Sequence, residues 1–103
     1  MQVSSIQFCS SNVDANLEKA NLNATVLNEA NFYGANLARS NLSGAILSGA
    51  NLCSANLNYA DLRGANLFLA NLQGANLNGA KLEGANLREA NFCNNKATRE
   101  AQN

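Results

Sequence analysis

The sequence predicts an all-β fold of the solenoid class, in which one narrow tube is built from stacked coils. Two observations lead to it: a large side chain recurs every five residues, and Asn, Ala and Leu supply 20, 18 and 15 of the 103 residues. A period of five gives neither a helix with one apolar face nor a flat strand with one apolar side. The chain must therefore turn once per quintet, so that every large side chain points to a common axis.

Leu or Phe holds the same place in sixteen consecutive quintets, and we call it the central residue. Ala stands two residues before it, except at Thr25 and Ser40, because a narrow tube has room for one large side chain per quintet. All seven glycines stand two residues after it, where a tight turn can need positive φ. The predicted core comprises Leu17, Leu22, Leu27, Phe32, Leu37, Leu42, Leu47, Leu52, Leu57, Leu62, Leu67, Leu72, Leu77, Leu82, Leu87 and Phe92.

The unit Ala-Asn-Leu-x-Gly, repeated from Ala15 to about Asn94, resembles the pentapeptide repeat family, whose consensus is A(D/N)LXX. The resemblance implies a right-handed quadrilateral parallel β-helix, a β-solenoid with four quintets, or twenty residues, in each coil. Sixteen quintets then make about four regular coils, preceded by an N-terminal partial coil. The central residue and its Ala fill the interior, and the other positions face solvent.

Residues twenty apart show the relations expected of neighbours in stacked coils. Asn precedes the central residue in twelve quintets, and two of the four exceptions, Val26 and Ile46, are apolar and twenty apart. Charges of opposite sign also recur at this spacing, and facing pairs of that kind contribute about 0.2–1 kcal/mol each. The predicted inter-coil pairs are Asp61 with Lys81 and Arg63 with Glu83.

The repeat breaks at both ends of the chain. Val3, Phe8 and Val13 recur every five residues, but Leu17 follows Val13 by only four. We expect residues 1–14 to form a capping coil in shifted register, residues 15–94 to form the solenoid, and residues 95–103 to form a tail or a short capping helix. An open last coil would favour weak association end to end, so a monomer or a weak end-to-end dimer is expected.

The residues that catalysis and metal binding use are scarce. The chain has no His, and its repeated glycines lack the Lys-Ser/Thr of a phosphate loop. We therefore expect no enzyme activity, no catalytic residue, no metal site and no cofactor. Seven acidic residues balance seven basic ones, so neither nucleic acid nor a membrane is an expected partner.

Three cysteines, Cys9, Cys53 and Cys93, fit neither a disulfide framework nor a zinc motif. Cys53 and Cys93 share a column two coils apart, about 9.6 Å by strand spacing, which exceeds the reach of a disulfide. Three free thiols and an N-terminus without signal-peptide features favour a cytoplasmic location.

One side of the predicted solenoid carries exposed apolar residues and is the candidate docking surface for another protein. Scattered apolar surface residues are common, however, and give the alternative explanation. A second group, Lys19, Arg39 and Tyr59, lines up on another side and is expected to be solvated surface. The candidate docking surface consists of Val26, Ile46, Phe68, Leu69 and Arg88.

The expected function is that of a non-catalytic structural or protein-interaction module whose partner is unknown. The family resemblance implies an alternative, because some pentapeptide repeat proteins imitate DNA and bind type II topoisomerases such as gyrase, which gives quinolone resistance. That role needs a dense negative charge along the rod. Here Asp61 is the single Asp at a position that carries Asn twelve times, and the net charge is zero, which disfavours the alternative.

Overall fold

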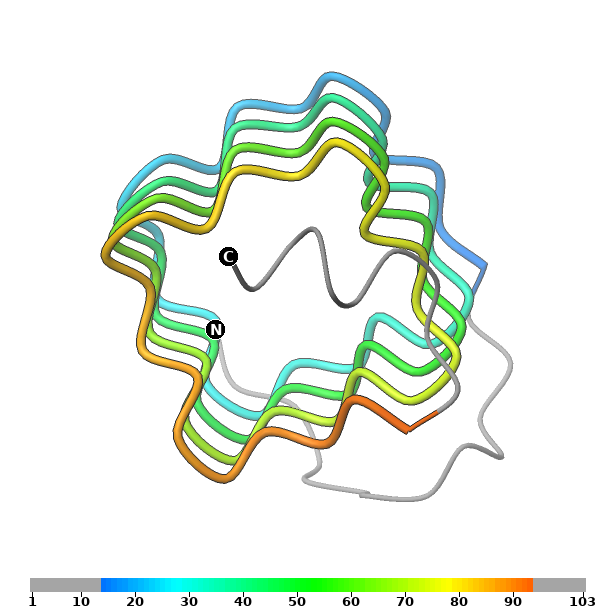
Figure 1. Ribbon diagram of the computed structural model, residues 1–103. Helices are drawn as coiled ribbons and strands as arrows, with labels where there is room; N and C mark the ends of the chain where they lie inside the picture. Colours follow the sequence, from blue (N-terminus) through cyan, green and yellow to red (C-terminus); the bar gives the residue numbers. More distant parts are fainter. Residues whose placement is uncertain (1–13, 94–103) are drawn as a thin grey trace.

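The computed structural model describes residues 14–93, which Figure 1 shows as a four-sided coil with its turns stacked on one another. Single-residue parallel bridges, rather than long strands, connect neighbouring turns, and each bridge joins residues twenty apart. The predicted twenty-residue register is therefore confirmed for these residues. The bridges pair Asn16 with Asn36, Asn21 with Asn41, Val26 with Ile46, Asn31 with Asn51, Asn36 with Asn56, Asn41 with Asp61, Ile46 with Asn66, Asn51 with Asn71, Asn56 with Asn76, Asp61 with Lys81, Asn66 with Asn86, and Asn71 with Asn91.

We name the residue before the central residue the bridge residue, and the residue two after it the turn residue. We number the coils by residues 15–34, 35–54, 55–74 and 75–93, and the four sides by the order of their quintets in each coil. The first side thus holds the quintets of Leu17, Leu37, Leu57 and Leu77, and the third side those of Leu27, Leu47, Leu67 and Leu87.

Three backbone hydrogen bonds per quintet connect one coil to the next. The N–H of the central residue Leu37 donates to the carbonyl of Asn56 at 2.8 Å, and the N–H of the turn residue Arg39 donates to Asn58 at 2.8 Å. In the opposite direction, the N–H of the bridge residue Asn56 donates to the carbonyl of Ala35 at 2.9 Å. Because this pattern repeats along the solenoid, each coil presents different backbone groups to the coil before it and the coil after it.

Every quintet bends at its turn residue. The N–H of Ala60 donates to the carbonyl of Leu57 at 3.0 Å, and the intervening Tyr59 has φ of 59°, the positive value that a type II turn requires at its third residue. All seven glycines have positive φ at this place, as the sequence predicts. Glycine is nevertheless not required, because Lys19, Arg39 and Leu69 adopt the same conformation.

The bridge Asn residues stabilise these turns through their side chains. Oδ1 of Asn56 accepts the N–H of Asn58 at 3.0 Å, and equivalent bonds recur in the other quintets. Ladders between coils, which stacked asparagines can form, are seen at Asn51 to Asn31 and at Asn86 to Asn66, with distances of 3.4 and 3.3 Å. The Asn columns thus serve first to satisfy the backbone of the turn.

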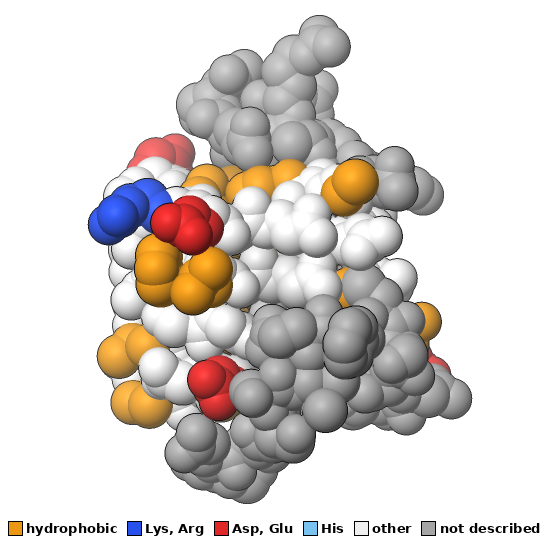
Figure 2. All heavy atoms as spheres, turned by 90° about the horizontal axis from the view of Figure 1, so that it is seen from below, with side chains coloured by type: hydrophobic (Ala, Val, Ile, Leu, Met, Phe, Trp, Pro, Cys, Tyr) orange, Lys and Arg blue, Asp and Glu red, His pale blue; other side chains and the backbone are white. Residues whose placement is uncertain are grey.

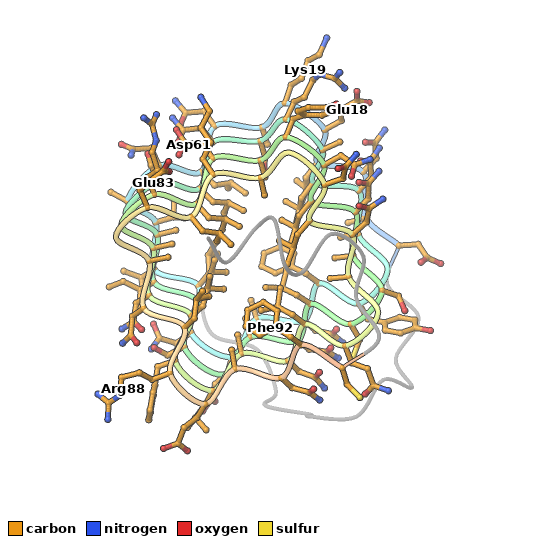
Figure 3. The ribbon with its side chains drawn as sticks, in the orientation of Figure 1. Glu18, Lys19, Asp61, Glu83, Arg88 and Phe92 are labelled. Carbon is orange, nitrogen blue, oxygen red and sulfur yellow. The ribbon has the colours of Figure 1, made fainter. Side chains whose placement is uncertain are left out.

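The core lies along the axis of the tube, and its side chains are most completely buried in the middle coils. The central residues from Leu37 to Leu77 are fully buried, and the Ala residues of the same quintets pack between them. The central residues nearest the two ends of the solenoid are only partly buried, because a coil at an end has a neighbour on one side. They include Phe92, which points into the interior of the coil in Figure 3.

The start of the regular backbone pattern lies at or before Asp14. Its φ is 50° and its N–H donates to the carbonyl of Tyr33 at 3.0 Å, as in a turn residue. Asp14 therefore follows the register of the solenoid, although the sequence assigns it to the capping segment. The rest of that segment and the expected C-terminal tail, residues 1–13 and 95–103, lie outside the described residues. Residues 14–93 contain no helix long and apolar enough to cross a membrane.

Candidate functional site

The third side carries the predicted docking surface, which begins with Val26 and Ile46. These two bridge residues pair directly, with the N–H of Ile46 donating to Thr25 at 2.9 Å and the N–H of Leu27 donating to Ile46 at 2.7 Å. Both side chains face solvent, with 58% of Val26 and 36% of Ile46 exposed. Figure 2, seen from the edge where Figure 3 labels Arg88, shows apolar side chains gathered beside acidic and basic ones.

Phe68, Leu69 and Arg88 form a second group on this side. The guanidinium of Arg88 lies over the ring of Phe68, 5.7 Å from its centre, and Leu69 is 48% exposed. The bridge residue that follows Ile46 in its column is Asn66. The five predicted residues therefore lie on one side of the solenoid as two adjacent groups rather than as one continuous cluster.

The charged residues that the sequence pairs between coils make their closest ionic contact within one quintet instead. Asp61 and Lys81 form a parallel bridge, but the ion pair of Asp61 is with Arg63 at 2.7 Å, within one quintet. The side-chain hydrogen bond from Arg63 lowers the pKa of Asp61 from 3.8 to about 2, assisted by the backbone N–H of Arg63 and by the charges of Arg63 and Lys81. Asp61, through its hydrogen bond and its charge, raises the pKa of the Arg63 guanidinium, and the charge of Glu83 acts in the same direction.

On the first side, Arg39 and Tyr59 interact more specifically than solvated surface residues would. The guanidinium of Arg39 lies 5.0 Å from the centre of the Tyr59 ring, and the ring continues over Gly79 in the next coil. The spacing of twenty residues between Arg39 and Tyr59 indicated that they are neighbours. It did not indicate that the Tyr59 ring would extend towards Gly79.

The cysteines differ from the expectation of three free thiols. Cys53 is fully buried and disulfide-bonded, so the expectation is wrong for this residue. Within the part of the chain that the structure describes, Cys93 is an exposed free thiol, as expected. Within residues 14–93, no group of three or more Cys, Asp or Glu side chains is placed to hold a metal ion.

The geometry agrees with a match to a known sequence family. The model of pentapeptide repeats matches residues 13–49, 35–74, 45–84 and 70–99, with eight copies of its unit. The chain belongs to the pentapeptide repeat family. None of the curated proteins compared with it matches significantly.

Solved structures of other pentapeptide repeat proteins resemble the solenoid. Rfr23 from the cyanobacterium Cyanothece 51142 is 44% identical with a TM-score of 0.79, over 80% of this chain and 56% of that one. A protein from Nostoc Pcc 7120 is 40% identical with a TM-score of 0.55, over 76% and 60%. The plasmid-mediated fluoroquinolone resistance protein QnrB1, 22% identical with a TM-score of 0.71 over 78% and 45%, shares the fold. The chain thus spans between 45% and 60% of the length of these proteins.

Proposed function

We propose that this pentapeptide repeat protein is a non-catalytic module that binds another protein through its third side. The supporting observation is the exposed pair of Val26 and Ile46 at bridge positions, where the other bridge residues are Asn, Asp or Lys. A bridge Asn also accepts the N–H of its turn, and neither Val26 nor Ile46 can do so. Two neighbouring coils therefore forgo a stabilising side-chain bond and expose apolar surface, which suits recognition of an apolar partner.

The rigidity of the solenoid supports a scaffold role. Inter-coil hydrogen bonds fix the backbone of each side, so side chains in a column repeat at about 4.8 Å. The Arg88 guanidinium over Phe68 and the exposed Leu69 add an aromatic and a cationic group to the same side. Aromatic residues and Arg are enriched in protein interfaces, and a preformed surface loses little entropy when it binds.

The charge of the rod favours this proposal over imitation of DNA. Residues 14–93 carry six acidic and five basic side chains, so the described surface is nearly neutral. A protein that replaces a duplex would need an excess of negative charge. Inhibition or protection of gyrase in a supercoiling assay would instead support the topoisomerase-binding alternative.

The test is a quantitative comparison of partner capture from a native extract. The double variant Val26→Asn, Ile46→Asn restores the commonest bridge residue and its turn bond, so it is expected to fold and to lose the captured protein. Tyr59→Asn removes an exposed aromatic residue from the first side and serves as the matched control, because Asn tolerates positive φ. Equal capture by the double variant and the wild type would contradict the proposal.

A further inference from the structure

The fourth side of the solenoid carries two fully buried residues outside the core cluster. Asn51 in the second coil is 1% exposed, and it is the one buried bridge residue among the sixteen in residues 14–93. Cys53 in the same quintet has no exposed surface, and its backbone N–H donates to Oδ1 of Asn51 at 3.0 Å. The sulfur that Cys53 contributes to its disulfide is therefore out of reach of solvent.

The surroundings of Cys53 also lack the groups that would stabilise a thiolate. On the fourth side, the quintets of residues 14–93 read ANFYG, ANLCS, ANLQG and ANFC, so this part of the chain places no Lys or Arg there. The side chain of Asn51 is already engaged, because its Oδ1 accepts the N–H of Cys53 and its Nδ2 donates to Oδ1 of Asn31 at 3.4 Å. Reactive cysteines, by contrast, are partly exposed and lie beside a cation or at a helix N-terminus. Cys53 thus has the environment of a structural cysteine.

Reduction of a disulfide by a dithiol needs access to a sulfur and a place for a thiolate. The thiolate of the reductant attacks one sulfur, so that a new S–S bond forms and the other cysteine leaves as a thiolate, which takes up a proton. The second thiol of the reductant then displaces the first cysteine. The reductant loses two electrons as its own disulfide closes, and the protein gains them as two thiols.

Both routes into this reaction are hindered at Cys53. Attack on its own sulfur is blocked, since that side chain has no exposed surface. Attack on the other sulfur of the bond would expel Cys53 as a buried thiolate, and an anion without water or a counter-charge carries a large free-energy cost. We propose that the folded solenoid protects the Cys53 disulfide, and that a dithiol reduces it only after the fourth side opens locally. The bond and the local structure then stabilise each other, so the stability of this side depends on the redox state of Cys53.

Cys93 provides an internal comparison. It lies in the same column two coils further on, and it is an exposed free thiol. A mixed disulfide of Cys93 with glutathione therefore has the same kind of bond on the same side without the burial. The difference between the reduction rates of the two bonds isolates the effect of burial.

The test measures how fast dithiothreitol reduces the two disulfides in one sample of the oxidised full chain. Aliquots are quenched with acid, alkylated and analysed by mass spectrometry of the peptides that contain Cys53 and Cys93. In native buffer we expect Cys53 to appear as a thiol roughly 100-fold more slowly than Cys93, because a local opening must precede the reaction. Urea below the unfolding transition should accelerate reduction at Cys53 and leave reduction at Cys93 unchanged.

Two matched variants test whether the opening is local to the fourth side. Asn51→Ala removes the buried amide beside Cys53 and should speed reduction at Cys53 by roughly tenfold. Asn56→Ala removes the same kind of turn bond on the first side, where Oδ1 of Asn56 accepts the N–H of Asn58 at 3.0 Å, and should leave the rate unchanged. Circular dichroism and urea unfolding check that both variants keep the fold.

Three results would overturn the proposal. The first is reduction of Cys53 in native buffer as fast as reduction of the Cys93 adduct. The second is a urea dependence as steep as that of global unfolding, which would show that the whole solenoid must unfold before the bond is reduced. The third is equal acceleration by Asn51→Ala and Asn56→Ala.

The inference is independent of the proposed function, because it concerns the fourth side and partner binding concerns the third. The double variant Val26→Asn, Ile46→Asn should be reduced at the wild-type rate whether or not it captures a partner. Equal partner capture by that variant and the wild type would therefore bear on the proposed function alone, and fast reduction of Cys53 would bear on this inference alone.

Discussion

The ring of Tyr59 occupies the space in which a side chain at Gly79 would begin. A Cβ built on Gly79 would lie 2.5 Å from two ring carbons of Tyr59, although the two residues are twenty apart in the sequence. Arg39 in the preceding coil contacts the same ring at 5.0 Å. Three turn residues of the first side thus form one column, and a side chain at the last of them would displace the ring of Tyr59.

Gly79→Ala should destabilise the protein more than Gly84→Ala. Both glycines are turn residues with nearly equal φ, 75° and 76°, so both substitutions carry the same backbone strain of about 1–2 kcal/mol. The nearest atom to a Cβ at Gly84 is the Gly64 nitrogen at 3.7 Å, an ordinary contact. Displacing Tyr59 from Arg39 adds about 1 kcal/mol to the cost of Gly79→Ala. Urea unfolding of both variants measures the difference, and equal losses would contradict this reading of the column.

Ser40→Ala should stabilise the protein by about 1 kcal/mol. Ser40 is buried where most quintets have Ala, and its hydroxyl has no hydrogen-bond partner among the described residues, so the substitution removes a desolvated polar group. Thr25→Ala is the matched control at the same place in another quintet. Thr25 Oγ1 donates to the carbonyl of Leu22 at 2.7 Å, so this change should give no such gain. The midpoint of thermal unfolding should rise for Ser40→Ala and should not rise for Thr25→Ala.

Asp61→Asn should remove a component of acid sensitivity. Because the pKa of Asp61 is lowered to about 2 in the folded protein, its carboxylate stabilises the fold above pH 4, and this contribution is lost as the pH falls from 4 towards 2. The ion pair is partly exposed, so solvent screening limits the contribution to about 1 kcal/mol. The variant should be slightly less stable than the wild type at pH 7 and equally stable near pH 2. Parallel stability curves over this range would contradict the prediction.

The cost of a core truncation should depend on the position of the coil. Leu57 is fully buried in the third coil, and Leu57→Ala should cost about 3–5 kcal/mol, because it leaves a cavity between coils that cannot collapse. Leu22 in the first coil is only partly buried, so Leu22→Ala should cost clearly less. Chemical denaturation provides the two free energies of unfolding, and equal losses would show that the end coil is packed as tightly as the middle.

The candidate docking surface illustrates how far a repeat sequence can be interpreted. The spacing of Val26 and Ile46 was enough to predict that they are neighbours, because a fixed period converts sequence distance into position. The period could not predict that Val26 and Ile46 form one group and that Phe68 and Leu69 belong to another. It does not indicate how far each side chain extends over the next coil. Likewise, opposite charges twenty apart suggested a contact of Arg63 with Glu83, whereas the flexible guanidinium reaches Asp61 within its own quintet.

The sequence by itself determined the quintet and the central residues, because these follow from a period that each short stretch of chain repeats. The twenty-residue register was implied by the family resemblance and agreed with the charged and apolar residues that lie twenty apart. Only the tertiary structure decided which turn residues other than glycine take positive φ and how burial falls towards the ends. The physical reason is that these properties depend on hydrogen bonds and packing between residues twenty apart. A coil acquires them only when another coil lies beside it.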